Sequence, residues 1–146
     1  IEYAKENNLE CFRGEPLDVL DRYYKCAKEF SLETIVRMNS DAPFLDPVLV
    51  DEVVNKFQEN DFDFVSNNII RTYPIGIDTE VFSFNTLEKT WKEAKLPSER
   101  EHVTTFMKKN NEMFKIYNLE NKYALYEIQK GRIYTDTVEN VAIIKK

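Results

Sequence analysis

Glycine is scarce in this chain, which has only three glycines among its 146 residues. Loops that cradle nucleotide phosphates with backbone N–H groups need several glycines in a short segment, because only glycine lets the backbone come so close. No segment of the sequence meets that need. Histidine occurs once, and no Ser-His-Asp or Cys-His arrangement has a usable spacing. These absences exclude a glycine-rich phosphate loop and the common nucleophilic triads from the residues given.

Cysteines are few, and long apolar runs are absent from the sequence. Cys11 and Cys26 are the two cysteines, and their spacing does not suit a metal site. We expect both thiols to be reduced and buried, as in a cytoplasmic protein. No apolar run in the sequence approaches the roughly 20 residues that a membrane helix needs. We therefore expect a cytoplasmic protein that has no membrane partner.

Basic residues do not dominate, because 20 Lys and Arg stand against 26 Asp and Glu and the formal net charge is −6. A surface that binds duplex nucleic acid needs clustered cations, so nucleic acid is not an expected partner. An anionic small molecule is compatible with this charge, since a local group of arginines and a metal ion can override it. The length and the 42% hydrophobic content are those of one packed domain, residues 1–146.

Strand and helix patterns alternate along the chain. Short β-branched or aromatic runs predict strands, and apolar residues at positions i, i+3, i+4 and i+7 predict helices. The expected strands are 9–13, 34–38, 62–66, 78–84 and 114–119, with less defined apolar runs after residue 122. The expected helices begin at residues 16, 47, 85 and 98, and the last runs to residue 109. This alternation predicts an α/β fold in which helices cover both faces of a sheet.

One aspartate is placed where α/β proteins bind ligands. Asp41 follows the expected strand 34–38, on a turn that Pro43 stiffens. In open α/β sheets, ligands bind at the carboxyl ends of strands. Asp136 follows another expected strand, 132–135, and would converge with Asp41 if the two strands are neighbours. One or two carboxylates suffice for Mg²⁺, which takes its other oxygens from water and phosphate. The alternative is that both aspartates only cap turns.

The one histidine lies in the segment from Ser98 to Thr104. Ser98 and Glu101 have the spacing of a capping box, which explains them as the start of a helix. That pattern does not explain His102, which lies beside Arg100 and Glu101. His102 would either bind substrate oxygens and carry protons, or make a structural hydrogen bond.

Asp61-Phe-Asp63 is similar to the Asp-x-Asp motif of metal-dependent glycosyltransferases. It precedes an expected strand here, whereas a ligand-binding motif would follow one. We therefore expect Phe62 and Phe64 to point inward and the two aspartates to be exposed.

A set of co-linear motifs runs through nearly the whole chain. The motifs are Phe12-Arg-Gly-Glu, Asp18-Val-Leu-Asp-Arg-Tyr23, Val36-Arg-x-x-x-Asp41-x-Pro-Phe-Leu-Asp-Pro47, Phe64-Val-Ser-Asn67, Arg71-Thr-Tyr-Pro-x-Gly-x-Asp-x-Glu-Val-Phe-Ser83, Glu99-Arg-Glu-His-Val-Thr104 and Arg132-x-x-Thr-Asp-Thr137. In order and spacing, this set resembles the cytidylyltransferases of spore-coat polysaccharide biosynthesis.

The resemblance implies a Rossmann-like nucleotidyltransferase fold, a three-layer sandwich related to the enzymes that activate sialic acids and 3-deoxy-octulosonate. Such enzymes transfer CMP from CTP to a hydroxyl of a sugar or sugar acid, with Mg²⁺ as cofactor, and release pyrophosphate. By matching position, Asp41 and Asp136 would bind Mg²⁺ and act in catalysis together with Arg100. The other residues carried over are Arg13, Gly14 and Asp18 near the nucleotide, and Arg71, Tyr73, Glu80, Glu101 and His102 on the sugar side.

The chain also departs from the pattern that it resembles. The family's N-terminal strand and its basic, glycine-containing loop have no counterpart here, and residues 1–9 look like the end of a helix already under way. Asn39-Ser40 replaces a Thr-Gly pair before Asp41, and Ile133-Tyr134 replaces a Trp-Thr pair before Asp136. We therefore expect an N-terminally truncated domain. Its sheet would expose an edge that is prone to pair with another copy, which predicts a homodimer.

Three functions follow from the sequence. The first is a sugar cytidylyltransferase, or part of one, in a surface-polysaccharide pathway. The second is a non-catalytic module of the same fold that binds a sugar or a partner chain, and the missing phosphate loop favours it. The third is a metal-dependent glycosyltransferase, which would depend on Asp61 and Asp63.

Overall fold

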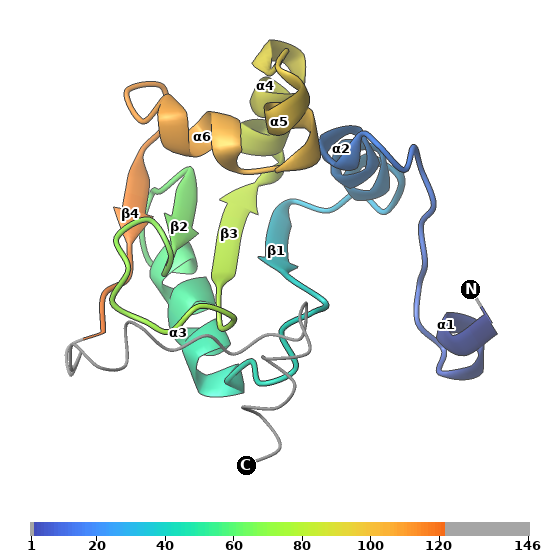
Figure 1. Cartoon of the computed structure of the whole chain (residues 1–146), viewed down its shortest axis with the longest axis horizontal. Coiled ribbons are helices and arrows are strands. Elements are labelled where there is room, and N and C mark those ends of the chain that lie inside the picture. Colours follow the sequence, from blue (N-terminus) through green and yellow to red (C-terminus); the bar gives the residue numbers. More distant parts are fainter. Residues whose placement is uncertain (1, 122–146) are drawn as a thin grey trace.

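Helices and strands alternate in the computed structural model, which describes residues 2–121 (Figure 1). The helices are α1 (Glu2–Glu6), α2 (Val19–Glu29), α3 (Pro47–Gln58), α4 (Phe84–Glu93), α5 (Pro97–Glu101) and α6 (Thr105–Lys109). The strands are β1 (Thr34–Met38), β2 (Phe64–Ser66), β3 (Thr79–Ser83) and β4 (Ile116–Asn118). The α/β class predicted from the sequence is confirmed. The apolar runs expected after residue 122 lie outside the described residues.

The described strands form one mixed sheet in the order β1-β3-β2-β4. β3 pairs antiparallel with β1 and with β2, whereas β2 and β4 are parallel. β1, β2 and β4 therefore point the same way, and β3 alone is reversed. As a result, the carboxyl ends of β1 and β2 meet the start of β3 at one edge of the sheet. Among the described residues, β1 is a terminal strand with one unpaired side.

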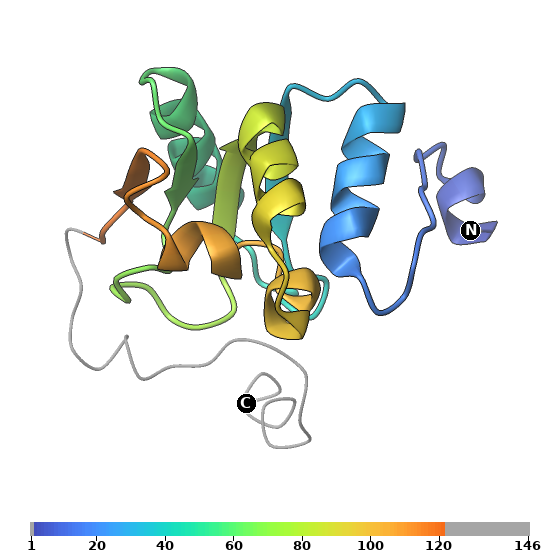
Figure 2. The ribbon, with the colours of Figure 1, turned by 90° about the horizontal axis from the view of Figure 1, so that it is seen from above.

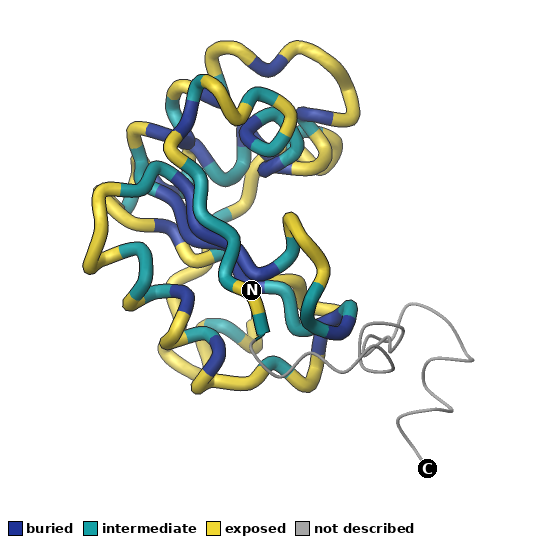
Figure 3. Tube along the Cα trace, turned by 90° about the vertical axis from the view of Figure 1, so that its left-hand side faces the viewer, coloured by how far each residue is buried: buried dark blue, intermediate teal, exposed yellow. Residues whose placement is uncertain are grey.

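Helices cover both faces of this sheet, which gives the three layers that the sequence predicts (Figure 2). On one face, Phe64 and Phe82 join a core with side chains of α2, α4 and α6. On the other face, the neighbouring residues Val65 and Val81 pack against α3. The alternation follows from strand geometry, because successive side chains point to opposite faces. Figure 3 shows the buried stretches concentrated in the strands. The described residues thus form a three-layer α/β arrangement, with the sheet between two layers of helices.

Helix α3 begins where its sequence predicts. The Asp46 carboxylate accepts a hydrogen bond from the Val48 backbone N–H at 2.9 Å, and Pro47 occupies the first turn. Proline is suited to that position because its missing N–H has no partner inside the helix. Leu49 and Val53 then lie one turn apart on the buried face. The cap fixes the first turn of the helix, and the apolar face fixes its contact with the sheet.

Replacing Asp46 by alanine is expected to lower the free energy of unfolding by about 1 kcal/mol, because the first turn loses its side-chain acceptor. Urea denaturation of the wild type and the variant measures this loss. Asp51 is the matched control, since it is an exposed aspartate on the same helix. Its replacement by alanine should change the free energy by less than about 0.5 kcal/mol. Equal losses in the two variants would contradict the capping role.

The strand predicted at residues 9–13 is wrong. This segment has no strand partner, and it runs outside the sheet beside α2 (Figure 2). Gly14 permits this close approach, because an added Cβ would lie 3.2 Å from Cγ of Arg22 and from a ring carbon of Phe12. Cys11 is exposed and Cys26 is half-buried, and both are free thiols. The prediction of buried thiols is therefore wrong for Cys11 and is met only in part for Cys26.

The single helix predicted at residues 98–109 is divided into α5 and α6. The break falls at His102–Thr104, where Val103 is fully buried and Thr104 is 5% exposed. The predicted capping box of Ser98 and Glu101 is also wrong. Glu99 has that role instead, since its carboxylate accepts from the backbone N–H groups of residues 95 and 96 at 3.3 Å.

Helix α1 stands apart from the rest of the molecule at the end of an extended segment (Figure 1). None of its residues is buried. Within residues 2–121, no helix is long and apolar enough to cross a membrane.

Candidate active site at the carboxyl edge of the sheet

Polar side chains gather at one edge of the sheet. We call this region the carboxyl edge, and it consists of residues 37–41, 66–68 and 78–80. The ends of β1 and β2 and the start of β3 come together there because β3 is the reversed strand. Ligands of α/β proteins bind at such an edge. The carboxyl edge is therefore the candidate active site.

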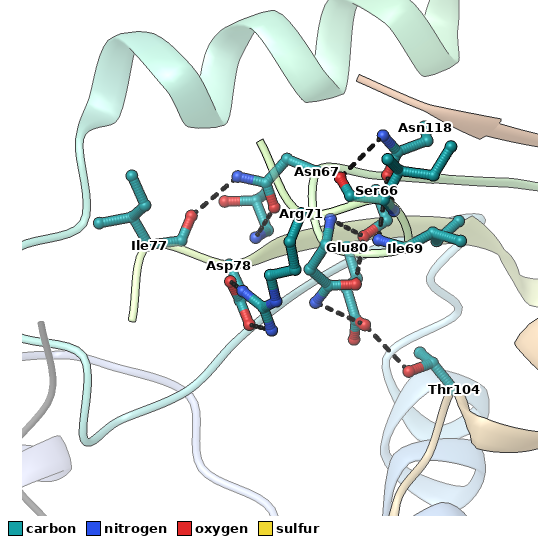
Figure 4. Close-up of polar contacts among 12 residues, drawn as sticks. Ser66, Asn67, Ile69, Arg71, Ile77, Asp78, Glu80, Thr104 and Asn118 are labelled. Carbon is teal, nitrogen blue, oxygen red and sulfur yellow. Dashed lines mark hydrogen bonds and ion pairs between the residues drawn. The ribbon is translucent and has the colours of Figure 1, made fainter. Parts of the chain in front are cut away.

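Glu80 lies at the centre of this edge and is 1% exposed. One carboxylate oxygen accepts a hydrogen bond from Arg37 Nη1 at 2.7 Å. The other accepts from Lys108 Nζ at 2.6 Å, from Thr104 Oγ1 at 3.0 Å and from Asn68 Nδ2 at 3.1 Å. Figure 4 shows Glu80 facing Thr104 across this network. Its buried carboxylate thus has four donors, and a substrate would meet Glu80 through Arg37 and Lys108.

The charge of Glu80 depends on its neighbours. Burial would raise the pKa of Glu80, because the charged form loses hydration, but the charges of Lys108 and then Arg37 outweigh burial and lower the pKa. Glu80 is therefore ionised at neutral pH. Tyr23 on α2 lies close to this network. Burial raises the pKa of Tyr23, while the Arg37 charge opposes the rise.

Asp41 lies on the turn that follows β1, and its residue surface is exposed. The Ala42 N–H closes this turn by donating to the Asn39 carbonyl at 3.2 Å. An exposed carboxylate at a carboxyl edge has the chemistry that Mg²⁺ requires, because this ion prefers oxygen ligands and needs only one or two from the protein. Among residues 2–121, no group of three or more Asp, Glu, Cys or His side chains is arranged to hold a metal ion. Asp136 lies outside the described residues.

A long loop joins β2 to β3, between the strands expected at residues 62–66 and 78–84, and side chains hold it in place. Asn67 is fully buried; its amide nitrogen donates to the Ile77 carbonyl at 2.9 Å and its oxygen accepts from the Thr79 N–H at 2.9 Å. Asn118 on β4 accepts from two backbone N–H groups of the loop, at 3.0 and 3.1 Å. Figure 4 shows both asparagines inside the turn of the loop. The loop is thus fixed against the sheet at both ends.

Arg71 and Tyr73, both predicted on the sugar side, lie on this loop. Arg71 forms a two-point ion pair with Asp78, with distances of 2.6 and 2.9 Å between nitrogen and oxygen. Tyr73 is half-buried and lines a groove of about 740 Å³ beside α3, together with Glu52 and residues 119–121. Burial, followed by the charge of Glu52, raises the pKa of Tyr73. Arg71 is thus at the carboxyl edge, whereas Tyr73 faces the α3 side.

Asp18 and Arg100 bind each other. The Arg100 guanidinium donates through Nε and Nη2 to one Asp18 oxygen, at 2.9 and 2.6 Å. The other Asp18 oxygen caps α2 by accepting from the Asp21 N–H at 2.9 Å. Arg100 also donates to the Trp91 carbonyl at 3.0 Å. These contacts tie α5 to the start of α2 and to the end of α4.

The remaining predicted residues lie on the surface. Arg13, Gly14, Glu101 and His102 are all exposed. His102 ends α5, and its backbone N–H donates to the Ser98 carbonyl. Within residues 2–121, the structure therefore brings Asp41, Arg71 and Glu80 together at the carboxyl edge. It places Asp18 and Arg100 at a separate contact between helices.

The Asp61-Phe-Asp63 motif has the structural role that its position predicts. Phe64 is fully buried and Phe62 is half-buried against Tyr117, with 5.2 Å between ring centroids. Asp61 is exposed, as expected. Asp63 is half-buried instead, and its carboxylate accepts from the Lys115 N–H at 2.8 Å. Asp63 thereby joins the start of β2 to β4.

Sequence reasoning missed the cations around Glu80. Arg37 lies in the mostly apolar strand β1 and Glu80 lies in β3, and the two residues are cross-strand partners in the register of these strands. Opposite charges within two neighbouring strands were the available signal. Lys108 and Thr104 gave no such signal, because their approach depends on the break between α5 and α6.

Comparison with known proteins points to one family. The family model of the cytidylyltransferases matches residues 3–145. An uncharacterized protein of Methanocaldococcus jannaschii is 41% identical over 121 residues, which are 82% of this chain and 48% of that protein. The spore coat polysaccharide biosynthesis protein SpsF of Bacillus subtilis is 29% identical over 143 residues, which are 96% of this chain and 57% of that protein.

A solved structure has the same fold. A cytidylyltransferase from Leptospira borgpetersenii superposes with a TM-score of 0.90 and 34% sequence identity, covering 99% of this chain and 60% of that one. The chain thus spans about half the length of the curated relatives that it matches, 48% and 57%.

Proposed function

Because the chain belongs to the cytidylyltransferase family, we propose that it is part of an enzyme that transfers CMP from CTP to a sugar or sugar acid. The match over residues 3–145 is the observation that carries this proposal. In the reaction, a sugar hydroxyl oxygen forms a bond to the α-phosphorus of CTP, and the bond to the bridging oxygen breaks. Pyrophosphate leaves, and the hydroxyl proton passes to solvent. A role in surface-polysaccharide synthesis is proposed by analogy with the name of the Bacillus relative.

Asp41 and Asp136 are the residues that we propose to hold Mg²⁺. When bound, the ion would supply charge neutralisation at the attacked phosphoryl group. Asp41 is suited to this role because it is exposed at the carboxyl edge. Arg71 and Glu80 lie at the same edge and would face the sugar, together with Tyr73, Glu101 and His102. Arg13, Gly14 and Asp18 would lie near the nucleotide.

Arg100 is the third proposed catalytic residue, and its ion pair with Asp18 limits how it can act. The Arg100 guanidinium already makes three hydrogen bonds to Asp18 and to the Trp91 carbonyl. Within residues 2–121, two of its five N–H donors remain for contact with a phosphate. Fixed arginines of this kind position anionic groups without reorganisation during the reaction.

We place the enzyme in the cytoplasm, since both cysteines are free thiols. Its proposed partners are CTP, the sugar substrate and a second copy of the chain. The unpaired side of β1 within the described sheet supports the dimer, because unpaired strand edges favour pairing.

A non-catalytic binding module is the second candidate function. The observation in its favour is that three of the predicted site residues are already in ion pairs. Asp18 and Arg100 pair with each other, and Glu80 pairs with Arg37 and Lys108. The glycosyltransferase alternative lacks such support, because the Asp63 carboxylate accepts a backbone hydrogen bond from Lys115.

Replacing Asp41 by alanine is expected to lower the rate of pyrophosphate release from CTP by at least about 100-fold, because charge on the transferred phosphoryl group loses its compensation. The assay contains CTP, Mg²⁺ and a panel of sugars and sugar acids, with the wild type as reference. Asp61→Ala is the control, since Asp61 is an exposed aspartate away from the carboxyl edge. It should leave the rate unchanged.

Thermal unfolding separates the two candidate functions. If the wild type releases no pyrophosphate and CTP with Mg²⁺ does not raise its unfolding temperature, the enzyme proposal fails and the binding module stands. A rate that falls equally in Asp41→Ala and Asp61→Ala would also contradict the role of Asp41.

A further inference from the structure

Three charged side chains from three elements meet at the carboxyl edge. Arg37 on β1, Glu80 on β3 and Lys108 on α6 form a group that we call the triad. Glu80 bridges the two cations, with Arg37 on one oxygen at 2.7 Å and Lys108 on the other at 2.6 Å. The side chains of Arg37 and Lys108 are 20% and 28% exposed, whereas that of Glu80 is 1% exposed. The cations therefore reach the surface and the carboxylate does not.

Burial of the three charges of the triad costs free energy of hydration. Each ion loses hydration on burial, and a well-packed apolar group of similar volume is often as stable or more stable. Stability alone therefore gives little reason for three charges at this edge of the sheet. Their position at the edge where α/β proteins bind ligands indicates a role in binding.

The triad carries an uncompensated positive charge, since two cations share one carboxylate. In the described part of the chain, its two cations also have N–H donors that no acceptor uses. Within residues 2–121, Arg37 donates only through Nη1, and its Nε is buried without an acceptor. Lys108 donates to Glu80 and to Asn68 Oδ1, at 2.7 Å for the latter, and an ammonium group has three hydrogens. Unused N–H donors and a net positive charge both favour binding of an anionic oxygen group of a ligand.

We propose that Glu80 is a positioning residue that holds the Arg37 guanidinium and the Lys108 ammonium together, so that the two cations bind an anionic oxygen group of a substrate. The group is a phosphate or a carboxylate, and either would accept from both cations at once. This inference rests on the proposed function for the identity of the substrate, but anion binding itself requires no turnover. Glu80 acts through the two cations and does not touch the ligand.

The test is a titration of the full chain followed by NMR of the Arg37 Nε–H signal. That proton is buried, which slows its exchange with water and makes it a local reporter. The probes are pyrophosphate for a phosphate source, glucuronate for a carboxylate source and glucose as the uncharged control. We expect saturable shifts with one or both anions and none with glucose. The stronger of the two anions identifies which substrate group the triad receives.

Two variants separate specific binding from general attraction. Lys108→Met should weaken anion binding about tenfold, because one charge-assisted hydrogen bond is lost. Lys109→Met is the matched control, since Lys109 is the next residue on α6 and its side chain is 55% exposed. It should bind as the wild type does. Equal weakening in both variants would overturn the proposal, because it would mean that overall charge alone attracts the anion.

Glu80→Gln tests positioning directly. The change raises the net charge of the triad from +1 to +2, so simple attraction predicts tighter anion binding. Positioning predicts weaker binding, because glutamine can accept from one cation but presents its amide N–H groups to the other. Urea denaturation shows whether Glu80→Gln is folded. If it is not folded, the comparison of Lys108→Met with Lys109→Met decides the proposal. Absence of any shift in the folded wild type overturns the triad proposal, whereas failure of CTP turnover alone concerns only the proposed function.

Discussion

Replacing Glu80 by alanine is expected to lower the free energy of unfolding by about 3–5 kcal/mol at neutral pH. The carboxylate is 1% exposed and is the shared counter-charge of Arg37 and Lys108. Without it, two partly buried cations face each other, and Thr104 and Asn68 each lose an acceptor. The size of the loss comes from the charges left behind more than from the bonds removed. Urea denaturation at pH 7 measures it.

The pH dependence of this difference provides a second measurement. The pKa of Glu80 in the folded chain lies below its ordinary value of 4.5, because Lys108 and Arg37 outweigh the effect of burial. A lowered pKa gives stability that is complete above the ordinary value and is lost as the pH falls through the folded value. The difference between wild type and Glu80→Ala should therefore be constant near neutral pH and shrink below pH 4.5.

Glu88→Ala is the control for this prediction. Glu88 is also paired with a lysine, at 2.9 Å from Lys92, but its side chain is 35% exposed. Exposed pairs of this kind contribute less than about 1 kcal/mol. A loss in Glu80→Ala no larger than that in Glu88→Ala would mean that water, not Glu80, compensates the two cations.

Local sequence signals were sufficient for the elements that local contacts decide. β1 has the predicted bounds, because its apolar run ends at the polar pair Asn39-Ser40. Helix α3 was predicted from Asp46-Pro47 and an apolar face, and all of these act within one or two turns. The place of the long loop after β2 follows from the two strands expected on either side of it, although the side chains that hold it were not predicted.

The errors arise where a distant partner decides the structure. Residues 9–13 have a strand-like pattern, but a strand needs a neighbouring strand, and here the chain approaches Arg22 of α2 at Gly14 instead. The break between α5 and α6 depends on Thr104, which turns toward Glu80 on the sheet. A short segment of the sequence predicts neither contact. The helix expected to begin at residue 85 begins at Phe84, and Ser83 caps it because β3 ends there without an intervening turn.

The candidate site was predicted only in part for the same reason. The position of Asp41 follows from the strand that precedes it, so sequence reasoning could place it at the carboxyl edge. The pairing of Asp18 with Arg100 joins residues 82 positions apart and has no local signal. Lys108 reaches Glu80 only after α6 has packed on the sheet. A single sequence thus indicates which side chains carry charge, and the tertiary fold decides which charges meet.

Phe64→Ala is expected to lower the free energy of unfolding by about 3–5 kcal/mol, through lost burial and the cavity that remains. Phe64 is fully buried on β2, and its register partners are Phe82 on β3 and Ile116 on β4. The ring centroids of Phe64 and Phe82 are 6.2 Å apart. Removal of this ring leaves a void between central strands that a short strand cannot close by moving.

Denaturation of two further variants decides whether the cavity explains this loss. Phe64→Leu refills part of the space and should recover roughly half of the free energy. Phe44→Ala removes the same ring from a turn where the residue is 50% exposed, and it should cost less than about 0.5 kcal/mol. If Phe44→Ala is as harmful as Phe64→Ala, burial is not the cause.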